Sequence, residues 1–157
     1  MGQRVQGTLQ KLSRQLIDDM VNEIVSGGRV ASGDLKGSFK SDITENFLGI
    51  KSDVEYASNV NLGRMPGKFP NINKLQRWVK IKFGSGPYPN TYGGRRPLKL
   101  KDITYLIGRK IATQGYPGIN YVGKAFLNAE SILTKELGDA YTLDLEEQLE
   151  KQIPNLK

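Results

Sequence analysis

The stretch that decides the fold class begins at Leu9 and reads LQKLSRQLIDDMVNEIV up to Val25. Its apolar residues recur every three or four positions, which places them along one side of an α-helix. The stripe lasts about five turns, and Gly27 and Gly28 follow it, as glycines commonly follow the last turn of a helix. We predict a long amphipathic helix here. Its acidic residues lie largely off the stripe, which indicates a solvated face rather than a carboxylate metal cluster.

The pattern changes from a period of three or four to a period of two after residues 32–35, which read SGDL. Strict alternation of apolar and polar residues is typical of a half-buried strand. Asn46 tolerates the left-handed conformation that a tight turn requires. We therefore predict a hairpin that turns near Glu45-Asn46, with alternating runs at Phe39, Ser41, Ile43 and Glu45 and at Ile50, Ser52, Val54 and Tyr56.

Further helices are predicted in the second half of the chain. One follows a cap at Asn71 or Asn73 and closes at Gly84, and another runs from about Leu100 to Thr113. Trp78 falls on the apolar face of the first, which favours a core anchor over a stacking platform for bases or sugars. The sequence thus predicts an α+β fold in which a small antiparallel sheet is packed by several helices.

The C-terminal part is predicted to hold two long helices. A strongly periodic one starts after a possible cap at Asn120 and breaks at Gly138. A thinner, acidic stripe follows and ends at Pro154. We expect residues 1–137 to form one α+β domain and residues 138–157 an acidic helical arm that packs on a neighbouring subunit.

The segment from Gly84 to Pro97 is predicted to be a long exposed loop, because seven of its fourteen residues are Gly or Pro. A loop of this length in a compact domain is commonly functional. It lacks the glycine spacing of a phosphate-binding loop or a dinucleotide fingerprint, so a nucleotide site is not expected.

The chain contains no histidine and no cysteine. This composition excludes disulfide frameworks, His- and Cys-based zinc sites and the Ser-His-Asp and Cys-His relays. Residues 34–36 read DLK, which matches only the end of one nuclease pattern. We therefore expect no enzymatic activity, no cofactor and no metal.

The net charge of +7 is unevenly distributed. Residues 61–124 hold 13 basic residues and 1 acidic residue, whereas residues 125–157 hold 3 basic and 7 acidic ones. Three interpretations follow. The basic block binds nucleic acid through phosphates and without sequence preference, it meets the acidic tail of a second copy, or it is a solvated face. The candidate contact residues are Arg64, Lys68, Tyr88, Tyr92, Arg95, Arg96, Lys99 and Lys101.

No targeting signal or membrane-spanning run is visible, since no apolar stretch approaches about 18 residues. We expect the protein to act in a cytoplasm or in an assembled particle, with no membrane partner.

Four segments in this order resemble the minor tail component, or tail-completion, family of tailed bacteriophages. They are residues 32–38 (SGDLKGS), 56–63 (YASNVNLG), 72–79 (INKLQRWV) and 107–118 (IGRKIATQGYPG). The resemblance covers about residues 8–137. Ser32 stands where the family has Thr, Asn61 where it has Glu, and Gly108 where it has Ala, and the acidic segment after Gly138 looks like an addition.

The resemblance implies a small α+β virion protein without enzymatic activity. It would assemble as a homo-oligomeric ring in the neck, between the portal-adaptor complex and the tail, and would surround the DNA channel. Its partners would be copies of itself, portal, adaptor and tail proteins, with possible phosphate contacts to the genome. It would be assembled in the host cytoplasm. A free, basic, non-specific DNA-binding protein is the alternative.

Overall fold

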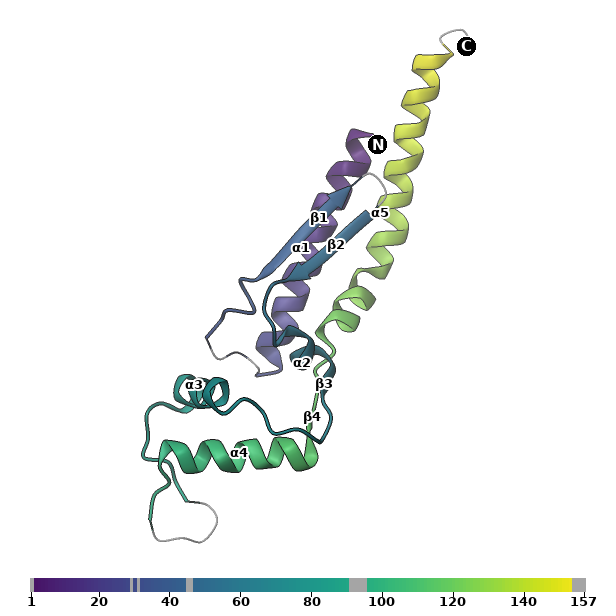
Figure 1. Cartoon of the computed structure of the whole chain (residues 1–157). Coiled ribbons are helices and arrows are strands. Elements are labelled where there is room, and N and C mark those ends of the chain that lie inside the picture. Colours follow the sequence, from purple (N-terminus) through teal and green to yellow (C-terminus); the bar gives the residue numbers. More distant parts are fainter. Residues whose placement is uncertain (1, 29, 31, 45–46, 91–95, 154–157) are drawn as a thin grey trace.

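Two long helices that lie side by side organise the chain (Figure 1). The computed structural model describes residues 2–28, 30, 32–44, 47–90 and 96–153. The elements are α1 (Gln3–Ser26), β1 (Phe39–Thr44), β2 (Phe47–Ser52), α2 (Ala57–Leu62), β3 (Gly63–Arg64), α3 (Ile72–Phe83), α4 (Leu100–Gln114), β4 (Tyr116–Pro117) and α5 (Tyr121–Gln152). Helices and two small antiparallel sheets make this an α+β fold, as predicted.

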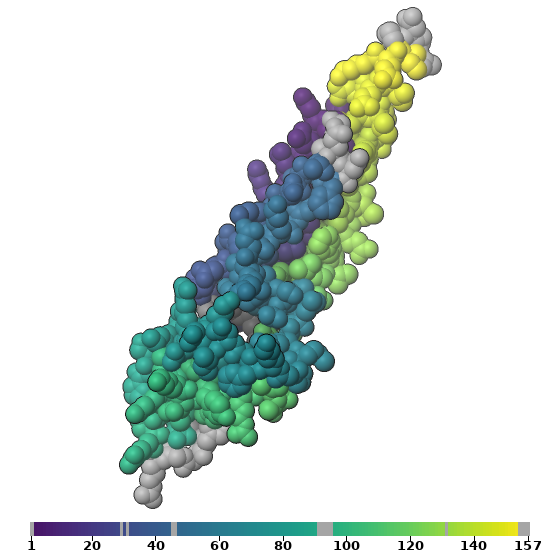
Figure 2. All heavy atoms as spheres, viewed as in Figure 1, coloured from purple at the N-terminus to yellow at the C-terminus, as the bar shows by residue number. Residues whose placement is uncertain are grey.

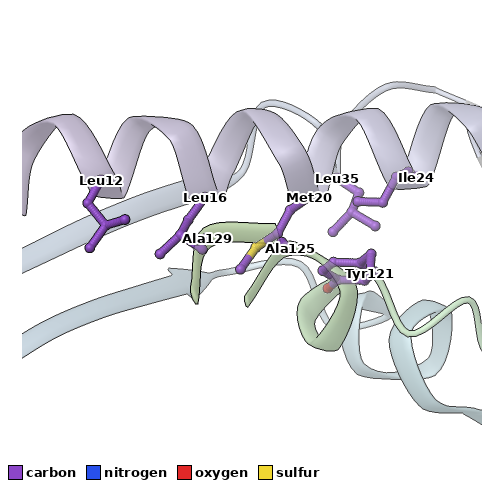
Figure 3. Packing of buried hydrophobic residues seen from close by; sticks show 8 residues of the cluster. All are labelled: Leu12, Leu16, Met20, Ile24, Leu35, Tyr121, Ala125 and Ala129. Atoms are coloured by element: carbon purple, nitrogen blue, oxygen red, sulfur yellow. The ribbon is translucent and has the colours of Figure 1, made fainter. Parts of the chain in front are cut away.

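The main core lies between α1 and α5, which run antiparallel. Figure 3 shows the apolar stripe of α1 facing α5, whose alanines allow the two backbones to approach closely. The cluster consists of Leu12, Leu16, Met20, Ile24, Leu35, Tyr121, Ala125 and Ala129. Ion pairs bridge the two helices at three levels: Arg4–Glu147, Lys11–Glu136 and Lys124–Glu23. The prediction of an amphipathic helix over residues 9–25 is confirmed, and α1 begins six residues earlier, at Gln3.

The first turn of α1 is capped from α5 rather than from its own sequence. Gly2, at the N-cap, has no side chain to offer, and the buried Asp144 carboxylate accepts the Val5 backbone N–H at 3.0 Å and the Arg4 N–H at 3.4 Å. A Cβ on Gly2 would lie 1.9 Å from Asp144 Oδ2. Glycine at position 2 therefore lets the carboxylate reach the free N–H groups of the helix end.

The hairpin lies against α1. β1 and β2 are antiparallel with Phe39 opposite Ser52, Ile43 opposite Leu48, and Thr44 opposite Phe47. Phe39, Ile43, Leu48 and Ile50 turn towards the helices. The predicted hairpin is confirmed, but its second strand spans Phe47–Ser52 instead of 50–56. The predicted turn residues, Glu45 and Asn46, lie outside the described part of the chain.

The helices α3 and α4 form a separate lobe together with the short ribbon of β3 and β4. In Figure 1 the lobe sits at the end of the α1–α5 pair from which α5 starts, with α4 lying across it. Lys82 Nζ fastens α3 to the Gly28 and Val30 carbonyls, at 3.2 and 3.0 Å. We call this unit the lobe, and α1, the hairpin, α2 and α5 the body.

Two helix predictions were wrong in detail. α5 continues through Gly138 to Gln152, because one glycine costs a helix only about 1 kcal/mol and Ala140 and Asp144 beyond it pack on α1. Trp78 is 38% exposed and makes an edge contact with Phe83. Val79, one position on, takes the fully buried place on α3. Asn71 caps α3 as predicted, by accepting the Asn73 and Lys74 N–H groups.

Candidate interaction surface

The predicted contact residues divide into three groups. Tyr92 and Arg95 lie outside the described residues. Tyr88, predicted on an exposed loop, is buried: its backbone pairs with Leu98 and its hydroxyl donates to the Gly84 carbonyl. This packing ties the two ends of the 84–97 segment together, so Tyr88 does not serve as an exposed stacking ring.

The remaining predicted residues lie on the lobe, but at different places. Arg96 and Lys99 are exposed just before α4, and the Lys99 backbone N–H donates to Asp102 Oδ2 at 3.0 Å, which closes the first turn of α4. Lys101 is exposed on the helix itself. Asp102 is the one acidic residue between positions 61 and 124, so the exterior of the lobe is strongly positive.

Arg64 and Lys68 reach α4 through the loop that links β3 to α3. The Arg64 guanidinium donates to the Lys68 carbonyl at 2.8 Å, which bends the loop. The Gly67 N–H donates to the Ala112 carbonyl at 2.7 Å and lays the loop along α4. Gly115, with φ +65, admits the Arg64 carbonyl where a Cβ would lie 2.1 Å from it. The loop that carries these two cations therefore lies against α4.

An exposed aromatic pair completes that side of α4. Phe69 covers Gly108 and stacks on Tyr105, with ring centroids 5.9 Å apart. Tyr105 is 56% exposed. Lys101, Tyr105 and Arg109 are spaced by four residues and so lie in one row on the helix. We call Arg64, Lys68, Phe69, Lys101, Tyr105 and Arg109 the basic face.

Sequence reasoning missed three members of the basic face: Phe69, Tyr105 and Arg109. The spacing of Lys101, Tyr105 and Arg109 is a readable signal, because positions four apart share one side of a helix. The position of Phe69 over Gly108 depends on a loop contact that no spacing reveals.

The other end of the molecule carries the opposite charge. From Asp139 to Gln152 α5 has five acidic residues and one lysine. Figure 2 places this segment, in yellow, at the far tip of an elongated molecule from the lobe, in teal and green. The basic and acidic parts of the sequence therefore lie at opposite ends of the molecule.

The described residues contain no group of three or more acidic side chains placed to hold a metal ion. Two open hollows lie on α1 and α5, and residues that line the one on α5 include Phe126, Leu127 and Leu133. Burial raises the pKa of the Tyr121 phenol, whose hydroxyl donates to the Ala57 carbonyl at 3.3 Å. That tyrosine is a part of the core.

None of the described helices has both the length and the apolar content to cross a membrane.

Comparisons with protein-family models, curated proteins and solved structures found no match to this chain.

Proposed function

We propose that this protein is a structural subunit of a tailed-bacteriophage virion, one copy of a ring in the neck that joins the portal-adaptor complex to the tail and surrounds the DNA channel. The observation that carries the proposal is the two-ended construction of the molecule. A basic, aromatic face and an acidic, apolar helix end lie at opposite tips. A subunit with complementary surfaces at its two ends binds copies of itself head to tail, and such contacts close into rings when the rotation allows.

Exposed apolar side chains support an assembly role. On the body and the lobe, several large ones are about half exposed or more: Phe47, Leu62, Met65, Phe83, Leu127, Leu145 and Leu149. Leu145 and Leu149 lie four residues apart on one side of α5, and contiguous apolar patches mark places where proteins meet. The four segments that resemble the tail-completion family occur in the same order as in that family, and this supports a position in the phage neck.

Incorporation into a particle tests this proposal. The full chain would be mixed with the portal, adaptor and tail proteins of a phage that encodes it, and the assemblies imaged by electron microscopy. We expect a ring of this chain at the neck. Particles that join heads to tails without it would contradict the proposal.

A second function, non-specific DNA binding, rests on the row Lys101, Tyr105 and Arg109. Cations alternating with an exposed ring suit phosphate contacts beside base stacking. Its test is a salt titration of DNA binding. A monomer whose affinity falls steeply with salt would favour this function over the connector.

A further inference from the structure

The last turns of α5 form an amphipathic surface that its own chain leaves open. α1 begins beside Asp144 and Glu147, so α5 extends beyond it (Figure 1). Tyr141, Leu145 and Leu149 are 44%, 56% and 56% exposed. Their spacing of four residues aligns them in one stripe. Such a stripe is typical of a helix that packs on another surface.

Acidic residues on this part of α5 fall into two sets. Asp144 and Glu147 turn towards α1 and bind Arg4. Asp139, Glu146 and Glu150 are spaced by seven and four residues, which places them in a row on a different side, next to the apolar stripe. Within the described residues this second set makes no ion pair. We call the row and the stripe together the acidic face.

The basic face offers the matching chemistry. Lys68, Lys101 and Arg109 likewise have no ion pair among the described residues, and Phe69 and Tyr105 supply exposed apolar area. Lys101 and Arg109 are eight residues apart, about 12 Å along the helix, and Asp139 and Glu150 are eleven apart, about 16 Å. The two rows of charge are therefore of similar length.

The lobe and the last turns of α5 lie at opposite ends of the elongated molecule (Figure 2), so the two faces can meet only between copies. We propose that the acidic face of α5 in one copy docks on the basic face of α4 in the next. This inference rests on the proposed function and names the contact through which the ring would form. The apolar stripe would cover Tyr105 and Phe69, while the flanking carboxylates pair with Lys101 and Arg109 and fix the register.

Cysteine cross-linking tests the contact directly, because the chain has no cysteine of its own. Full-length Gln152→Cys and Lys101→Cys proteins would be mixed under oxidising exchange. We expect mixed disulfide dimers in far greater proportion than random pairing gives. Lys80→Cys, which removes the same charge from the exposed side of α3, is the matched control partner. Mixed dimers no more abundant with Lys101→Cys than with Lys80→Cys would overturn the proposal.

Charge reversal supplies an independent readout that does not depend on a disulfide. The double variants E146K/E150K and K101E/R109E should each lose self-association in sedimentation, and the quadruple variant should regain it. R77E/K80E, with the same charge change on α3, should behave as the unaltered chain. Self-association that is insensitive to both double variants would overturn the proposal. So would a K101E/R109E variant that assembles normally but no longer binds DNA, since the basic face would then belong to nucleic acid.

These outcomes separate the inference from the proposed function. Rings at the neck whose copies are joined through other surfaces would overturn the docking of α5 on α4 and leave the connector standing. A chain that forms the mixed dimer but never enters the neck would overturn the connector function and leave the docking of α5 on α4 standing.

Discussion

The body and the lobe bury their residues in opposite ways. The body closes two clusters of buried residues between α1, α5 and the hairpin, and ion pairs join its two long helices along their length. Among the described residues of the lobe few side chains are buried, including Val79, Tyr88 and Thr104, and most of the cations there form no ion pair. We therefore expect substitutions in the body to affect the stability of the chain more than substitutions on the lobe, whose basic surface is open to solvent. Four experiments test this contrast.

The largest effect should come from the core of the body. Leu16 is 1% exposed between α1 and α5, and Leu16→Ala should lower the free energy of unfolding by about 2–5 kcal/mol, because it removes buried methyl groups and leaves a cavity. Urea denaturation measures this. Leu127→Ala, at a site 70% exposed on α5, should cost under about 0.5 kcal/mol. Equal losses at both sites would contradict the account.

Gly108 in α4 and Gly138 in α5 are both helical but differ in the space around them. A Cβ on Gly108, in α4, would lie 2.3 Å from the Phe69 ring, so Gly108→Ala should displace Phe69 and cost about 1–3 kcal/mol. Gly138, in α5, has nothing within 4 Å of such a Cβ, and Gly138→Ala should stabilise by about 0.5–1 kcal/mol. Thermal denaturation followed by circular dichroism gives both values. A destabilising Gly138→Ala would mean that the helix does not continue there.

The cap on α1 should have a smaller effect. Asp144→Ala removes the acceptor of the Val5 and Arg4 N–H groups and should cost about 0.5–2 kcal/mol. Hydrogen exchange should accelerate at Arg4 and Val5. The matched variant Asp139→Ala removes an exposed carboxylate and should leave their exchange unchanged. Unchanged protection in Asp144→Ala would contradict the capping role.

The smallest effect concerns the link between body and lobe. Glu55, before α2, pairs with Lys74 of α3. The hydrogen bond from Lys74 and its positive charge lower the pKa of Glu55 below the ordinary value of 4.5. Because the folded pKa is the lower one, the link is present above pH 4.5 and is lost as the pH falls through the folded pKa. In Lys74→Ala, an NMR titration should show the pKa of Glu55 back at its ordinary value. A pKa of Glu55 that is the same in Lys74→Ala and in the unaltered chain would contradict the proposed ion pair.

Local patterns predicted the elements of the body well, because helix and strand periods are set by burial on one face. α1 and the hairpin follow directly from their spacing. The continuation of α5 through Gly138 could not be predicted from spacing, since Ala140 and Asp144 pack on residues about 140 positions earlier in the chain. Asp144 reads as an ordinary surface acid until the fold sets it beside the first turn of α1.

The candidate surface was predicted in part. The basic block in the sequence located the lobe, and Arg64, Lys68 and Lys101 lie on its basic face. The prediction that Tyr88 is exposed was wrong, because the composition of a Gly- and Pro-rich segment does not indicate which of its rings is buried. Phe69 joined the face through a loop laid along α4 by the Gly67 hydrogen bond to Ala112, which is a tertiary contact.

We propose above that this chain is an assembly subunit with two complementary ends. Its mass in solution, measured across a series of protein and salt concentrations, tests this most directly. We expect masses that are multiples of 17.5 kDa at low salt and a shift towards the single chain as salt screens the charged contact. A single mass of 17.5 kDa at every protein and salt concentration would contradict it.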